Sequence, residues 1–268
     1  MELSARRGPE VHDRRPLLVL LHGFCLNAGM WARQMEGLAR RWPTVALDLR
    51  GVGGSVPVRD DRQPSIEVLA DDVAETLRLL GRGPAVVCGL SMGGYVAMVL
   101  ARRAPELLAG LVLANTKQEA DDEARRHERE RIASTMERER SVRVVVEEVA
   151  PAFTGATTRR RRPAAQELVD TLVAATPFEA AAWASRAMAR REDSAATLRA
   201  FEAPVLVVVG DEDVVSPPAG ASAMAGGLRD GSFACLPTAG HLSPVEVAPA
   251  FDACVGTFLE ARFGEAER

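Results

Sequence analysis

Short apolar runs alternate with amphipathic stretches along most of the chain. The runs are continuously hydrophobic and rich in Val, Leu and Ala, with few polar residues between the apolar ones. Such runs are typical of strands that are buried on both faces of a parallel sheet. The predicted strands are residues 17–21, 44–49, 85–90, 110–114, 204–210 and 232–237.

The stretches between these runs carry apolar residues at helical spacing. In residues 65–80 the apolar side chains recur every three or four positions and share one face of a helix. Further helices are predicted over residues 92–103, 217–227 and 246–261. The alternation of strands and helices predicts an α/β fold, with a mostly parallel, doubly wound sheet.

The alternation stops between about residue 116 and residue 200, where helical patterns replace the strands. We therefore expect a sheet core formed by residues 1–115 and 201–268, with residues 116–200 inserted as a helical cap, or lid. Within the cap, TTRRRRP (157–163) is predicted to be an exposed connection, and its arginines are expected to be solvated.

The composition is that of a soluble globular protein. Of the 268 residues 47% are hydrophobic and 26% are charged, and the formal net charge is −4. The lack of a basic excess and an aromatic content of only 4% argue against nucleic-acid binding. No run reaches the roughly 18 apolar residues of a membrane span, and the polar N-terminus lacks the apolar core of a secretory signal. We expect a cytoplasmic monomer or homodimer that does not bind membranes, with free cysteine thiols.

One serine lies in a distinctive turn pattern. The segment CGLSMGG (88–94) places Ser91 between glycines, after a predicted strand and before a predicted helix. G-x-S-x-G in this context is typical of a sharp turn that exposes a nucleophilic serine, although Ser91 could also act only as a helix cap. If Ser91 is a nucleophile, the N–H of Met92 can donate to the developing oxyanion. Gly23 permits a tight turn after the first strand, where the N–H of Phe24 is the candidate second donor.

A nucleophilic serine needs a base, and the chain has four histidines. His12 lies in the polar N-terminal segment and His127 in a charged helix, so both are expected at the surface. His22 ends the first buried strand and is expected to orient the loop that follows rather than to transfer protons. His241 lies in a loop after the last predicted strand, at the edge of the sheet where Ser91 is expected. It is therefore our candidate base.

The acid that orients this base should follow another strand. Asp211, Glu212 and Asp213 come directly after the strand 204–210, although a solvated acidic turn would have the same composition. The chain order serine, acid, histidine is the one expected of this fold. We prefer Asp213 because it lies furthest along the loop, towards the expected position of His241.

Five motifs stand along most of the chain in the order LLHGF, DLRGVGGS, GLSMGG, GDEDVVSP and AGHLSPVEVAPAF. Together they resemble the motifs of the α/β-hydrolase superfamily, in order and at normal separations. The resemblance implies an α/β-hydrolase fold with the triad Ser91, Asp213 and His241 and oxyanion donors at Phe24 and Met92. GLSMGG with LVLANT is similar to 3-oxoadipate enol-lactonases and related small carboxylesterases. Members usually begin with a β-hairpin, but only 16 residues precede the first strand here, so we expect one or both early strands to be missing.

These residues predict a serine hydrolase that cleaves a carboxylic ester or lactone of a small, largely apolar molecule through an acyl-enzyme. Neither a metal nor an organic cofactor is expected. Dehalogenases and epoxide hydrolases need an aspartate at the position of Ser91, which argues against both. The alternative is a biosynthetic or non-hydrolytic enzyme that uses the same triad. Such a triad can support perhydrolase or haloperoxidase chemistry, C–C hydrolysis, hydroxynitrile cleavage, thioester hydrolysis or acyl transfer. A non-catalytic ligand receptor is a further alternative.

The cap is expected to shape the substrate pocket. Most of its apolar side chains should belong to the core, but a few should face the substrate. The candidates for substrate contact are Phe153, Phe178, Trp183 and Met188 in the cap, and Trp31 after the oxyanion loop.

Overall fold

The computed structural model describes residues 3–9, 15–55, 57–58 and 62–264. In this part of the chain a seven-stranded sheet has the order β1-β3-β2-β4-β5-β6-β7. Strands β2 to β7 are parallel, and β1 pairs antiparallel with β3. The predicted doubly wound α/β sheet is confirmed. The strands are β1 (Ala5–Arg7), β2 (Leu18–Leu21), β3 (Thr44–Leu47), β4 (Ala85–Leu90), β5 (Leu108–Ala114), β6 (Val205–Gly210) and β7 (Gly231–Leu236).

The N-terminal segment contributes one strand that the sequence pattern does not reveal. Ala5–Arg7 pair with Val45–Leu47 at the edge of the sheet, and the two arginines of the strand are exposed. A short edge strand buries little side-chain surface, so its sequence lacks the apolar run by which the other strands are predicted. At least one of the two early strands that the sequence left in doubt is therefore present. His12 lies outside the described residues.

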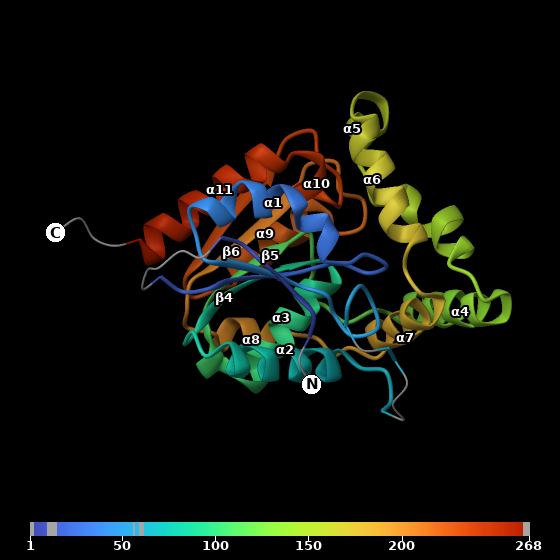
Figure 1. Ribbon diagram of the computed structural model, residues 1–268, viewed down its shortest axis with the longest axis horizontal. Helices are drawn as coiled ribbons and strands as arrows, with labels where there is room; N and C mark the ends of the chain where they lie inside the picture. The colour runs from blue at the N-terminus through green and yellow to red at the C-terminus, as the bar shows by residue number, and fades with distance from the viewer. Residues whose placement is uncertain (1–2, 10–14, 56, 59–61, 265–268) are drawn as a thin grey trace.

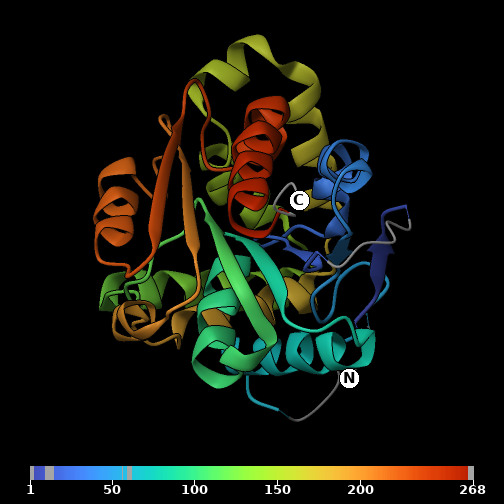
Figure 2. The same cartoon turned by 90° about the vertical axis from the view of Figure 1, so that its left-hand side faces the viewer.

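Helices cover both faces of the sheet (Figures 1 and 2). The first face carries α1 and α11, and the opposite face carries α2, α3 and α8. A further helix, α9 (Pro218–Gly226), packs against β6 and β7. The elements of the two faces are α1 (Ala32–Glu36), α11 (Ala248–Phe263), α2 (Ile66–Leu80), α3 (Met92–Arg103) and α8 (Ala195–Ala200).

The apolar runs supply the core. Every residue of β2, β3, β4 and β6 is buried, as expected for strands covered on both faces. Helix α2 begins where Ser65 accepts a hydrogen bond from the N–H of Val68 at 3.2 Å and ends at Gly81, whose φ is 62°. Both are standard end signals, which explains why the sequence locates this helix to within a residue.

The chain between β5 and β6 is helical, as its pattern predicts, and projects to one side of the sheet (Figure 1). Helices α4 and α7 pack on each other there. Besides α8, the elements are α4 (Glu123–Glu139), a π-helical turn η4 (Val145–Val149), a 3-10 turn η5 (Ala150–Ala152), α5 (Ala156–Arg161), α6 (Pro163–Ala174) and α7 (Phe178–Ala189).

The prediction of an exposed connection at residues 157–163 is wrong. Residues 157–161 lie in α5, and Pro163 is the first residue of α6, a position that suits proline because its missing N–H would have no partner there. Helix α5 is stabilised by distant groups: the carboxylate of Glu212 accepts the N–H of Thr157 at 2.7 Å. The arginine run is also not simply solvated, since Arg162 donates to the carbonyl and hydroxyl oxygens of Thr238, both at 2.8 Å.

Candidate active site

Ser91 lies on a strained turn between β4 and α3. Its φ is 51° and its ψ is −111°, a combination that residues with a side chain rarely adopt. A Cβ on Gly89 would lie 2.2 Å from the carbonyl oxygen of Gly93, and a Cβ on Gly93 would lie 2.4 Å from that of Leu21. Since both obstacles are backbone atoms, only glycine fits at either position. The G-x-S-x-G pattern is thus the packing requirement of this turn.

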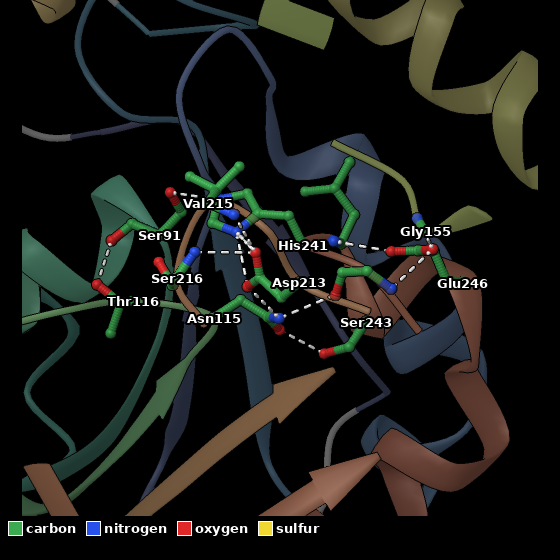
Figure 3. Close-up of polar contacts among 12 residues, drawn as sticks. Ser91, Asn115, Thr116, Gly155, Asp213, Val215, Ser216, His241, Ser243 and Glu246 are labelled. Atoms are coloured by element: carbon green, nitrogen blue, oxygen red, sulfur yellow. Dashed lines mark hydrogen bonds and ion pairs between the residues drawn. The ribbon is translucent and has the colours of Figure 1, made fainter. Parts of the chain in front are cut away.

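The turn brings Ser91 into a chain of hydrogen bonds with two distant residues (Figure 3). The Nε2 atom of His241 lies 2.9 Å from the Oγ of Ser91, and its Nδ1 lies 2.9 Å and 3.1 Å from the two carboxylate oxygens of Asp213. The side chains of His241 and Asp213 are almost completely buried. Thus a hydroxyl, an imidazole and a carboxylate from three separate loops are in contact, in the arrangement that activates a serine.

Besides His241, three further groups donate hydrogen bonds to the carboxylate of Asp213. Its Oδ1 accepts the N–H groups of Val215 at 2.8 Å and Ser216 at 2.9 Å, and its Oδ2 accepts the side-chain amide of Asn115 at 2.9 Å. Burial alone would raise the pKa of Asp213, but the charge of His241 and these hydrogen bonds outweigh it and hold the pKa below its ordinary value. An ionised Asp213 fixes the hydrogen of His241 on Nδ1 and leaves Nε2 free to accept a proton from Ser91.

The two neighbouring acids are engaged elsewhere. Asp211 accepts the N–H of Ala239 at 3.3 Å, and Glu212 accepts the N–H of Thr157 in α5. Of the three candidates for the acid, Asp213 is therefore the one that the structure brings to His241.

Asn115 belongs to the site but was not singled out in the sequence. It follows β5 with a φ of 47°, a conformation that asparagine tolerates better than most residues. Besides Asp213, its amide donates to the carbonyl oxygen of Gly240 at 3.0 Å, and its own oxygen accepts the hydroxyl of Ser243 at 2.5 Å. It therefore joins the acid loop to the histidine loop. The one available signal was a polar residue at the carboxyl end of a buried strand.

The loop after β2 lies against Ser91. A Cβ on Gly23 would be 3.6 Å from the Cβ of Ser91, and Phe24 lines the same cavity as Ser91. His22 accepts the N–H of Leu49 on Nε2 at 2.9 Å, so its Nδ1 carries the hydrogen and donates to the carbonyl oxygen of Gly23, also at 2.9 Å. Burial lowers the pKa of His22, which keeps it neutral in this role. The structure therefore engages both nitrogens of His22 in shaping the loop.

A cavity of about 120 Å³ opens onto Ser91 and His241. One part of its wall is apolar and includes Phe24, Phe153 and Met188, of which the last two were candidates for substrate contact. The rest of the wall is charged and belongs mainly to α4. The charged lining residues are Arg125, Glu128, Arg129 and Glu148.

The other candidates for substrate contact do not line this cavity. Trp31 is fully buried in the core, where its ring lies 6.1 Å from that of Phe251. Phe178 lies beneath the guanidinium of Arg140, at 5.1 Å. Trp183 lines a separate small cavity of about 10 Å³, together with His22, Cys25 and Met92.

Two larger pockets have volumes of about 510 and 640 Å³. None of the catalytic candidates named so far lines either of them. In the described ranges, no three or more His, Cys, Asp or Glu side chains are grouped so that they could hold a metal ion. No helix among the described residues is both long enough and apolar enough to span a membrane.

Comparison with known proteins identifies the family of this fold. The sequence model of the alpha/beta hydrolase fold family matches residues 16–246. A thermophilic esterase from Thermogutta terrifontis, solved with malate bound, is 34% identical, with a TM-score of 0.92 over 97% of this chain and 94% of its own. The enol-lactonase from Burkholderia xenovorans LB400 is 27% identical, with a TM-score of 0.85 over 96% of each chain.

Curated sequences are more distant over their full length. Pimeloyl-[acyl-carrier protein] methyl ester esterase of Nitrosospira multiformis is 25% identical over 85% of this chain and 88% of its own length. The first curated relatives match only locally, and the aligned part of this chain spans between 28% and 41% of their length.

Proposed function

Because the chain belongs to the α/β-hydrolase family, we propose that it is a serine hydrolase that cleaves a carboxylic ester or lactone of a small, largely apolar molecule. The observation that carries this proposal is the continuous hydrogen-bond chain from Ser91 through His241 to Asp213, at the wall of a cavity. An esterase and an enol-lactonase among the structural neighbours act on the same kind of bond.

In the first step, Nε2 of His241 removes the proton of Ser91 Oγ as that oxygen attacks the carbonyl carbon of the ester. Asp213 stabilises the imidazolium that forms and keeps the ring oriented. The tetrahedral intermediate collapses when His241 returns the proton to the leaving alcohol, which gives an acyl-enzyme on Ser91. Water, deprotonated by His241, then releases the acid and regenerates the serine.

The N–H groups of Phe24 and Met92 are the proposed oxyanion donors. Phe24 lies in the loop held against Ser91, and Met92 is the first residue of α3, whose N–H groups carry partial positive charge. In comparable enzymes one such donor lowers the barrier by about 2.7–4 kcal/mol. In this proposal, the strained turn at Ser91 brings the N–H of Met92 next to the nucleophile.

The helices between β5 and β6 are proposed to act as a cap of residues 116–200 over a core formed by residues 1–115 and 201–268. The cap supplies Phe153 and Met188 to the cavity wall. Covering the site excludes bulk water and strengthens the electrostatic interactions inside it. A cavity of about 120 Å³ is smaller than the roughly 300–1,000 Å³ of typical drug-sized ligand sites, which favours a short acyl group.

The first test is hydrolysis of p-nitrophenyl acetate, butyrate and octanoate and of a simple lactone by the wild type and by Ser91→Ala. We expect the wild type to prefer the shorter esters and Ser91→Ala to lose activity by a factor on the order of 10⁶. Ser134→Ala is the matched control because Ser134 is exposed on α4, away from the cavity lining. Turnover that survives in Ser91→Ala, or a wild type that hydrolyses none of these substrates, contradicts the proposal.

A further inference from the structure

A buried carboxylate lies behind His241, and the reaction described above gives it no role. Glu246 is the last residue of the short helix α10 (Ser243–Glu246), and 4% of its surface is exposed. Its Oε2 accepts the N–H of Gly155 at 2.7 Å and that of Gly240 at 3.0 Å, and its Oε1 accepts the N–H of Leu242 at 3.0 Å (Figure 3). All three partners are backbone groups.

Two of these partners are the residues on either side of His241. The N–H of Leu242 belongs to the peptide unit directly after His241, and the N–H of Gly240 belongs to the Ala239–Gly240 unit before it. By accepting both, Glu246 restrains the loop on either side of His241, and with it the position of the imidazole. Hydrogen bonds to an ionised acceptor are roughly twice as strong as neutral ones. A carboxylate is also well suited to this position, because it offers two acceptor oxygens and no donor.

The third partner belongs to the proposed cap. The backbones of Gly155 and Gly240 are in direct contact, since a Cβ on Gly240 would lie 2.2 Å from the nitrogen of Gly155. The N–H of Leu242 is shared between Glu246 and the carbonyl oxygen of Phe153, at 3.0 Å. The ring of Phe153 lines the cavity, and its centre is 6.3 Å from that of the His241 ring. Glu246 therefore connects the loop of the base with the part of the cap that faces the substrate.

We propose that Glu246 is a positioning residue for the hydrolytic reaction. It holds His241 at hydrogen-bond distance from Ser91 and fastens residues 153–155 of the cap to the same loop. This inference rests on the proposed function, because the base that Glu246 positions is the base of that reaction. Glu246 itself touches none of the reacting atoms.

The main test is Glu246→Gln. The glutamine side chain has one oxygen and one NH₂ group, so in either orientation at least one of the three N–H donors faces another donor. We expect kcat to fall between about 10-fold and 100-fold, since misplacing a catalytic group by about 1 Å can cost 100-fold. KM should change by less than about threefold, because Phe153 keeps its own hydrogen bond to the N–H of Leu242 and with it its place in the cavity wall.

Glu212→Gln is the matched control. Glu212 also fastens the cap, through the N–H and the hydroxyl of Thr157, but in the described structure its side-chain hydrogen bonds do not reach Gly240 or Leu242, the residues beside His241. We expect its kcat to stay within about twofold of the wild type. Equal losses in Glu212→Gln and Glu246→Gln would mean that cap attachment alone matters, and would overturn the assignment of Glu246.

A second measurement follows His241 without substrate. The hydrogen between Nδ1 of His241 and Asp213 should give a low-field proton resonance in the wild type and in Glu212→Gln. Glu246→Gln should shift or broaden it. If Glu246→Gln retains both this resonance and the wild-type kcat, the inference is wrong while the esterase proposal stands. If the wild type hydrolyses no ester and does not react with a fluorophosphonate, the proposed function fails, and the resonance still decides whether Glu246 positions His241.

Should Glu246→Gln fail to fold, Glu246→Asp answers the same question. Its carboxylate is one methylene shorter and cannot reach Gly155, Gly240 and Leu242 together. A loss of kcat of at least fivefold with an unchanged melting temperature would support the positioning role. Wild-type kcat in this variant would overturn it.

Discussion

At the scale of single residues, the site depends on how one carboxylate is surrounded. Asp213 accepts hydrogen bonds from His241, Asn115 and two backbone N–H groups, and these outweigh the burial that would otherwise keep it protonated. The buried acid is thereby charged at neutral pH, as the orientation of His241 requires. The same contacts make Asp213 a contributor to stability as well as to catalysis.

Asp213→Asn should separate these two contributions. We expect kcat to fall about 10⁴-fold at pH 7, because an amide at this position favours the wrong tautomer of His241. The folded pKa of Asp213 is lowered, so its charge stabilises the wild type above the unfolded pKa of about 3.9, and that contribution is lost as the pH falls through the folded value. The difference in unfolding free energy between wild type and Asp213→Asn should therefore shrink between pH 5 and pH 3. Urea denaturation at the two pH values checks this, and a constant difference would contradict it.

At the scale of elements, the turn between β4 and α3 tolerates no added atom. A Cβ on Gly93 would meet the backbone oxygen of Leu21 at 2.4 Å, whereas a Cβ on Gly220 in α9 would meet nothing within 4 Å. We expect Gly93→Ala to lower the unfolding free energy by more than about 2 kcal/mol and to abolish esterase activity, since backbone must shift to make room. Gly220→Ala should instead raise stability by about 0.4–1 kcal/mol. Urea denaturation of both variants measures the contrast, and similar behaviour of the two would show that the turn is not sterically determined.

The elements also show which parts of the structure the sequence could predict. The strands and α2 carry their signals locally, in apolar runs and in end residues such as Ser65 and Gly81, and were located closely. Ser91, Asp213 and His241, which the structure brings into contact, could be selected because glycine and loop patterns mark the ends of particular strands. Strand β1 and helix α5 were missed because their partners, β3 and Glu212, are distant in the chain.

Individual residues of the candidate site were missed for the same reason, because their partners are distant in the chain. Nothing near Asn115 or Glu246 in sequence indicates that one joins two loops and the other accepts three N–H groups. Trp31 lies shortly after Gly23 and Phe24 in the chain, yet its ring packs into the core. Side-chain direction at such positions depends on long-range packing, which a local pattern does not contain.

At the scale of the whole molecule, the core and the helices of the proposed cap contribute different chemistry to one cavity. Strand ends of the core supply Ser91 and His241, whereas α4 supplies a charged wall. Most of that charge is already paired. Arg129 contacts the buried Asp121, whose pKa falls to about 2 because the attraction of Arg129 and Arg191 outweighs its burial.

The remaining charges of the wall differ in how far they are neutralised. Glu128 and Glu148 both contact the guanidinium of Arg131. In contrast, the guanidinium of Arg125, which lines the cavity, makes no hydrogen bond or ion pair with any residue that the structure describes, although its charge contributes, after the contacts of Arg131, to lowering the pKa of Glu128. Arg125 is therefore the charged group of the wall that is available to a substrate. An ester that carries a carboxylate on its acyl chain would place an anion within its reach if it spans the cavity.

Arg125→Ala tests whether this wall selects substrates. We expect KM for mono-p-nitrophenyl succinate to rise about fivefold, since an exposed ion pair contributes up to about 1 kcal/mol, while KM for p-nitrophenyl butyrate changes by less than twofold. The increase should be smaller at 0.5 M NaCl, where exposed charges are screened. Arg126→Ala is the control, because Arg126 is the next residue of α4 but does not line the cavity. Equal effects of the two variants on the anionic ester would mean that the overall charge of α4, rather than a contact in the cavity, attracts the substrate.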